Sequence, residues 1–151
     1  MIKVTPITDI AHIIQLAVAP VFLLAGIGAM LNVLTARLGR IIDRARALEM
    51  SLPQLNDSDR QWSMQMLDML DRRMRVIHLA ITLCTSSALF VCIVVSLLFV
   101  ADLGDFGFGR TIALLFIAAM LLIVGGLVMF LVEIRLATRS VRVRRDLLRL
   151  P

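Results

Sequence analysis

The stretch of residues 19–46 reads APVFLLAGIGAMLNVLTARLGRIIDRAR, and its character changes halfway along. Its first part, as far as Ala36, carries no charge, whereas its second part carries four arginines and one aspartate. A helix rises about 1.5 Å per residue, so roughly 20 apolar residues cross a hydrocarbon core of about 30 Å. The stretch therefore predicts a transmembrane helix that leaves the membrane close to Arg37.

Two further uncharged blocks of similar length follow, at residues 79–101 and 111–132. Hydrophobic residues make up 60% of the chain, well above the roughly 45–50% of soluble proteins. Most of this excess falls in the three blocks, so we expect the lipid bilayer to surround them. We predict an all-α membrane protein made of one domain, residues 1–151, with spans at about 10–36, 76–101 and 111–133.

Helical patterns continue on both sides of the turn region SLPQLNDSD, residues 51–59. No helix breaker lies between Leu34 and Pro53, and apolar residues recur at helical spacing within residues 62–74. The first two transmembrane helices are therefore predicted to extend into a cytoplasmic helical hairpin at about residues 37–75. The third is expected to continue as a basic helix in the C-terminal tail, residues 134–151.

The basic residues are distributed unevenly along the chain. Fourteen of the sixteen lie within residues 37–75 or after Val132, whereas Lys3 alone precedes the first span and Arg110 alone lies between the second and third. Cytoplasmic segments of membrane proteins carry the excess of Lys and Arg. This asymmetry predicts a multi-pass protein with its N-terminus outside and its C-terminus in the cytoplasm.

The arginine-rich segments do not read as a nucleic-acid surface. Residues 37–75 hold eight basic and six acidic residues, a net charge of only +2, which favours a salt-bridged surface over a phosphate-tracking patch. The tail is more basic and has no aromatic residue. Attraction to anionic lipid headgroups, about 1 kcal/mol per basic residue near the surface, explains the tail more simply.

Small and polar residues recur on related faces of the first two spans and make a candidate polar seam. Small residues let helices approach closely in lipid, and polar side chains form hydrogen bonds across helices. The polar seam either locks a helix–helix interface or lines a water-filled path, and the sequence leaves both open. Its members are Gly28, Asn32, Thr35, Thr82 and Thr85.

Ion pairs are expected at the membrane edge and along the hairpin. An acid at the end of a span usually pairs with a base, and Glu133 follows the third block at about the predicted depth of Arg37, so we predict that these two residues pair. On the hairpin, the aspartates of the second helix are expected to face the arginines of the first. The candidate residues there are Arg40, Asp43, Arg44, Asp68 and Asp71.

No catalytic constellation is apparent. His12 and Gln15 lie one turn apart, but the other histidine, His78, is predicted on the opposite side of the membrane, and a zinc site needs three or four ligands. No nucleophile, base and acid can be assembled on one membrane face. We therefore predict that the protein is not an enzyme, and we predict no catalytic, cofactor-binding or metal-binding residue and no cofactor.

The segment Ala19–Arg46 resembles the start of the bacterial membrane-protein family called domain of unknown function 2721, whose members are similar in size and have three predicted spans. The resemblance implies a bacterial inner-membrane protein, and it implies no activity. The residues that carry it are Pro20, Gly26, Gly28, Asn32, Thr35, Arg37, Arg40, Asp43 and Arg44.

Two functional hypotheses follow from these patterns. The first is a small inner-membrane protein that acts by helix–helix association, as a homo-oligomer or as an accessory subunit of a membrane complex. The alternative is a small oligomeric ion channel or transporter in which the polar seam lines the path. Three helices do not easily enclose a pore, so the alternative also requires several copies.

Overall fold

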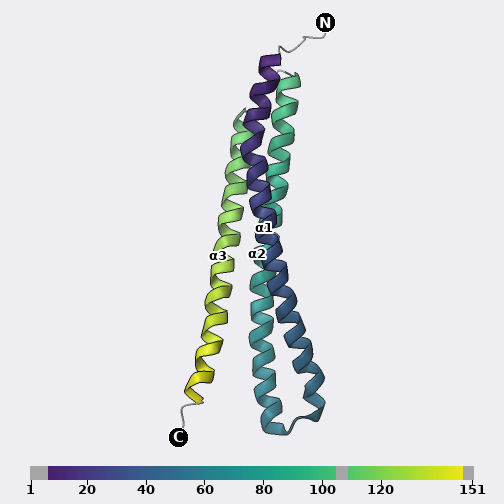
Figure 1. Cartoon of the computed structure of the whole chain (residues 1–151), viewed down its shortest axis with the longest axis vertical. Coiled ribbons are helices and arrows are strands. Elements are labelled where there is room, and N and C mark those ends of the chain that lie inside the picture. Colours follow the sequence, from purple (N-terminus) through teal and green to yellow (C-terminus); the bar gives the residue numbers. More distant parts are fainter. Residues whose placement is uncertain (1–6, 105–108, 148–151) are drawn as a thin grey trace. The chain divides into compact units, whose positions relative to one another are not determined.

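The computed structural model describes the backbone of residues 7–104 and 109–147. Side-chain surroundings are described within residues 14–101 and 109–137, apart from Leu16 and Ser58. In this part of the chain every long element is an α-helix, and there is no strand. The helices are α1 (Ile7–Ser51), α2 (Asp57–Gly104) and α3 (Gly109–Leu147), with a short 3-10 helix, η1 (Leu52–Gln54), between α1 and α2 (Figure 1).

Each α-helix contains a stretch that is long and apolar enough to cross a membrane. The prediction of an all-α fold with three such helices is confirmed. The helical stretches that contain these candidate spans are Ala17–Gln54, Asp59–Ala101 and Gly109–Ala137.

The ends of α1 and α2 follow from local sequence. Pro53 disfavours the α conformation of the residue before it, and α1 ends at Ser51, with η1 beginning at Leu52. Asp57 and Asp59 lie in the first turn of α2, where a negative charge interacts favourably with the helix dipole. Pro20 lies inside α1 without ending it.

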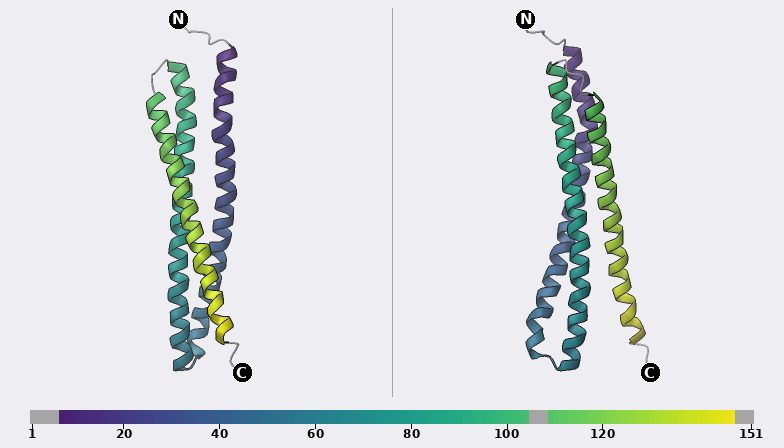
Figure 2. Two further views of the ribbon diagram at one scale, coloured as in Figure 1. Left: turned by 90° about the vertical axis from the view of Figure 1, so that its left-hand side faces the viewer. Right: turned by 180° about the vertical axis from the view of Figure 1, so that it is seen from behind.

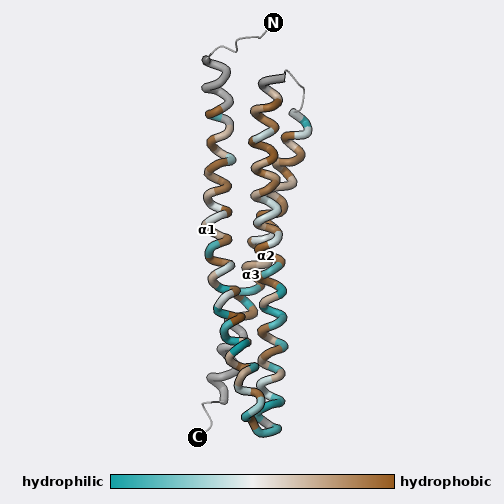
Figure 3. The backbone as a smooth tube through the Cα atoms, turned by 90° about the vertical axis from the view of Figure 1, so that its right-hand side faces the viewer, coloured by the Kyte–Doolittle hydropathy of each residue, from teal (hydrophilic) through white to brown (hydrophobic). Residues whose placement is uncertain are grey.

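The chain forms two compact units, and every α-helix contributes to both. The apolar unit consists of Met1–Leu31 and Leu83–Val124, and the charged unit consists of Asn32–Thr82 and Gly125–Pro151. Figure 3 shows hydrophobic residues along the helices of the apolar unit and many hydrophilic ones in the charged unit. The single domain expected from the sequence therefore stays a prediction.

The core of the apolar unit is built from small and β-branched residues. Ser87 on α2 and Ala119 on α3 are fully buried, and the Ser87 hydroxyl donates a hydrogen bond to the Ala119 carbonyl oxygen at 2.7 Å. A short side chain on each side allows this close approach of two helices. The other buried residues of this unit include Ala17, Ile27, Cys84, Val91, Val94 and Ile123.

The core of the charged unit is the apolar interface of a helical hairpin. The end of α1 and the start of α2 are joined by η1 and lie side by side in both views of Figure 2. Ile41 and Ala45 of α1 pack with Leu70 and Ile77 of α2. Spacings of four and seven residues place each pair on one helix face. Leu38, Leu48, Leu67, Met74 and Ile81 flank this core.

Candidate functional site

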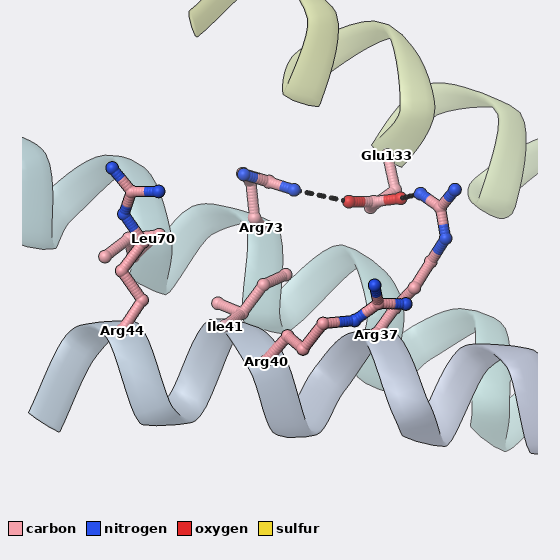
Figure 4. Close-up of a pocket in the computed structure, with 7 residues that line it drawn as sticks. All are labelled: Arg37, Arg40, Ile41, Arg44, Leu70, Arg73 and Glu133. Atoms are coloured by element: carbon pink, nitrogen blue, oxygen red, sulfur yellow. Dashed lines mark hydrogen bonds and ion pairs between the residues drawn. The ribbon is translucent and has the colours of Figure 1, made fainter.

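A buried carboxylate on α3 connects the three helices of the charged unit. Glu133 has no exposed surface, and each of its two oxygens accepts a hydrogen bond from a different arginine. Arg37 Nη1, from α1, donates to Oε2 at 2.9 Å, and Arg73 Nη2, from α2, donates to Oε1 at 2.8 Å (Figure 4). We call these three residues the Glu133 cluster.

The geometry of the Glu133 cluster compensates the burial of charge. A carboxylate removed from water is strongly destabilised unless it is paired and hydrogen-bonded, and here both oxygens have a cationic donor. The Arg37 guanidinium also lies 5.3 Å from the centroid of the Phe130 ring, within the range of a cation–π interaction. Phe130 precedes Glu133 by three residues, so one face of α3 supplies both contacts.

The hairpin core explains why these two arginines point toward α3. Arg37 lies four residues before Ile41, and Arg73 lies three after Leu70 and four before Ile77. Residues at such spacings share a helix face. The apolar residues that join α1 to α2 therefore also set the rotation of each helix, and this rotation brings both arginines to the side where α3 lies.

A cavity of about 320 Å³ lies beside the Glu133 cluster. We call it the arginine cavity; it is lined by the cluster together with Arg40, Ile41, Arg44 and Leu70. Figure 4 shows Arg40 and Arg44 extending from α1 on the same side as Arg37.

Several nitrogens of the arginine cavity are weakly bonded or unbonded within the part of the chain that the structure describes. Arg40 and Arg44 have no carboxylate partner there, and the one hydrogen bond from Arg40 runs from Nε to the Ala36 carbonyl of its own helix, at 3.4 Å. Arg73 Nε is buried and has no hydrogen-bond partner.

The structure brings together one of the ion pairs predicted from the sequence. Arg37 and Glu133 are in contact, whereas the second partner of Glu133, Arg73, was not predicted. A signal for it was present, because Arg73 shares the helical phase of Leu70 and Ile77.

The expected charge contacts across the hairpin do not form among the described residues. Asp71 accepts instead from Arg75 of its own helix, at 3.2 Å, and Asp68 and Asp43 are exposed. The physical reason is that the interface between the two helices is apolar, so these charged side chains lie on its outer surfaces. Arg40 and Arg44 line the arginine cavity, and neither forms a salt bridge with a described residue of α2.

All five residues of the polar seam are exposed in the single chain. Beyond its chain neighbours and the nearby backbone of α1, an added Cβ at Gly28 would meet no heavy atom of the described chain within 4 Å. The hydroxyl of Thr35 donates to the Asn32 carbonyl at 3.0 Å, and that of Thr82 donates to the His78 carbonyl at 2.9 Å. Each of the five residues therefore lies on an exposed face of its own helix.

No group of three or more His, Cys, Asp or Glu residues that could hold a metal ion occurs within the described ranges. The side chain of His12 lies outside the described residues, as do those of the basic tail beyond Ala137.

Comparison with known proteins gives a family and no activity. The sequence model of the family described as "Protein of unknown function (DUF2721)" matches residues 17–143. Neither a curated protein nor a solved structure shows a significant match to the chain. The matched range includes every residue of the Glu133 cluster, of the arginine cavity and of the polar seam. Because the match spans most of the sequence, the chain belongs to this family of proteins of unknown function.

Proposed function

We propose that this protein acts by helix–helix association in a membrane. In this proposal a second copy of the chain docks on the three polar-seam residues of α1, which are Gly28, Asn32 and Thr35. The observation that carries the proposal is the outward position of this face on a helix long and apolar enough to cross a membrane. The proposal assigns the chain no catalytic activity.

The chemistry of Asn32 favours a partner of this kind. Its side chain is exposed, and within the described residues it forms no hydrogen bond. An amide without a partner is unfavourable in hydrocarbon. The amide group both donates and accepts, so two copies related by a two-fold axis can satisfy each other at the same position. Gly28, one turn away, leaves room for the second backbone.

The alternative is an oligomeric channel in which the polar seam lines the path, and the exposure of Thr82 and Thr85 on α2 is the observation in its favour. A water-filled path is best lined by groups whose donors are free for water or ions. The hydroxyl protons of Thr35 and Thr82 are used within their own helices, which supports association over conduction.

We place the protein in the inner membrane of a bacterium, with the N-terminus outside and the hairpin of the charged unit in the cytoplasm. The support is the charge asymmetry of the sequence together with the positive-inside rule. Anionic headgroups then lie next to the basic C-terminal tail.

The test is the mass of the purified full chain in a mild detergent, measured by native mass spectrometry over a dilution series. We expect a dimer or a higher oligomer. Gly28→Leu should raise the dissociation constant by about tenfold or more, a change of at least about 1.4 kcal/mol, because it obstructs backbone approach. Asn32→Leu should raise it about eightfold, since it removes two reciprocal hydrogen bonds of about 0.6 kcal/mol each.

Ala113→Leu is the matched control, because it adds the same side chain at an exposed small residue of α3, away from the polar seam. It should leave the mass distribution unchanged. A monomer at every concentration would refute self-association. Co-purification of a different protein in fixed stoichiometry would show that the partner is that protein rather than a second copy of this chain. Ion flux into liposomes that is lost in Asn32→Leu would favour the channel.

A further inference from the structure

We propose that the arginine cavity binds a phosphate group, carried either by an anionic phospholipid headgroup or by a soluble phosphate compound. Arg40 and Arg44 supply the attraction, because both line the cavity and neither has a carboxylate partner within the described residues. This site lies in the charged unit and does not depend on the association of two copies.

The charges around the arginine cavity are not balanced. Four guanidinium groups and one carboxylate line it, which leaves a formal charge of +3. Both oxygens of Glu133 already accept from Arg37 and Arg73, so this carboxylate does not also neutralise Arg40 and Arg44. Asp43 neighbours Arg44 in sequence, but adjacent residues on a helix do not face each other, and no ion pair joins them in the described chain.

Donors are available as well as charge. The guanidinium group of Arg44 is exposed and has no carboxylate partner within the described residues. The Arg40 Nε bond to Ala36 is 3.4 Å long, beyond the usual 2.7–3.2 Å of an N–H···O bond, so Arg40 loses little when it turns to a better acceptor. Phosphate oxygens are such acceptors, and the planar guanidinium group matches them with two parallel hydrogen bonds.

The size and lining of the cavity limit the ligand. A volume of about 320 Å³ lies at the lower end of the roughly 300–1,000 Å³ of small-molecule sites. It suits a phosphate with a small organic substituent rather than a large cofactor. Ile41 and Leu70 form the apolar part of the lining, and they suit the carbon atoms next to the phosphate.

The position of the cavity along the helices favours the lipid source. Arg37 follows the uncharged run of α1 directly, and Glu133 follows that of α3 directly, so both residues mark where a candidate span becomes charged. Phospholipid headgroups lie at such a boundary, and basic pockets between transmembrane helices bind anionic headgroups. The same guanidinium groups would bind a soluble phosphate compound.

The experiment compares two double variants of the full chain. Arg40→Gln with Arg44→Gln removes two arginines of the cavity and leaves the Glu133 cluster intact. Arg46→Gln with Arg60→Gln removes the same charge from exposed residues outside the cavity. All four arginines are exposed, so both variants should fold, and thermal unfolding in detergent checks this. Native mass spectrometry then measures how much phosphatidylglycerol or phosphatidylcholine each protein retains.

We expect the wild-type chain to retain phosphatidylglycerol in preference to phosphatidylcholine. The cavity variant should bind it about 25-fold more weakly, about fivefold per arginine, and the control variant should bind it nearly as the wild type does. A second arm adds inorganic phosphate, or sodium chloride at equal ionic strength, and measures the melting temperature. Stabilisation by phosphate without retention of phosphatidylglycerol supports the site with a soluble source.

Two outcomes would overturn the proposal. Equal losses in the two double variants would assign lipid retention to overall surface charge rather than to the cavity. Retention of phosphatidylglycerol no greater than that of phosphatidylcholine, together with no stabilisation by phosphate, would show that the cavity binds no phosphate from either source.

Discussion

In the apolar unit, α2 contacts α3 through the Ser87 hydroxyl and the Ala119 carbonyl, whereas in the charged unit α3 contacts α1 and α2 through the Glu133 carboxylate. The first contact is neutral, and its neighbours are small or β-branched residues. The second is ionic, and it lies beside the larger apolar side chains of the hairpin core. In the apolar unit, where lipid can surround the helices, close packing and neutral hydrogen bonds stabilise the helix contacts. In the charged unit, the burial of apolar helix faces and a compensated buried charge stabilise them instead.

The largest expected effect is on the charged unit. Glu133→Gln removes the negative charge between Arg37 and Arg73 but keeps the shape of the side chain. It should destabilise the protein by about 3 kcal/mol, the lower end of the range for breaking a buried ion pair, because the two arginine side chains remain 35% and 18% exposed. Thermal unfolding in detergent measures this loss.

The control for Glu133→Gln is Asp71→Asn, which breaks the exposed pair with Arg75. An exposed pair at this helical spacing contributes at most about 0.5 kcal/mol, so the melting temperature should hardly change. Equal effects of the two substitutions would mean that burial of Glu133 does not distinguish the two ion pairs.

The second expected effect separates the apolar contacts of the hairpin from its charges. Leu70→Ala should cost about 2–3 kcal/mol, within the range for truncating a buried leucine, because Leu70 is 3% exposed and packs in the hairpin core. Hydrogen exchange should show faster opening of residues 41–51 and 57–70 than of the apolar unit. The exposed Met69→Ala is the control, and uniform acceleration through both units would contradict independent cores.

The smallest expected effect is in the apolar unit. Ser87→Ala removes the hydrogen bond to the Ala119 carbonyl and should cost about 0.6 kcal/mol, the average for side-chain hydrogen bonds between transmembrane helices. Ser96→Ala, which removes only a bond to the carbonyl of Cys92 within α2, provides the comparison. A loss for Ser87→Ala as large as that for Glu133→Gln would remove the difference between the two units.

The sequence predicted the helices better than their contacts. Three uncharged blocks and one turn around Pro53 are enough to place α1, α2 and α3, because hydrophobic length and a helix breaker are local properties. The contact of Arg37 with Glu133 was also within reach, since both residues follow an apolar run directly. Opposite charges at one depth seldom have a better partner.

The remaining contacts depend on helix rotation, which the charges alone do not reveal. Arg72, Arg73 and Arg75 look equivalent in sequence, yet only Arg73 shares a face with Leu70 and Ile77 and reaches Glu133. The same apolar phase turns Asp68 away from the first helix of the hairpin. The helix face defined by Leu70 and Ile77 therefore distinguishes Arg73 from the other two arginines.

A carboxylate that is bonded at both oxygens also fixes how the α3 segment of the charged unit is aligned with the hairpin. One extra residue in α3 ahead of Glu133 would turn its side chain by about 100° and move it about 1.5 Å along the axis, so that neither Arg37 nor Arg73 remains in line with it. Insertions or deletions between Gly125 and Glu133 should therefore be tolerated far less than those beyond Ala137. The three charged side chains of the Glu133 cluster thus specify the number of residues in this segment of α3, because a segment one residue longer or shorter cannot form both ion pairs.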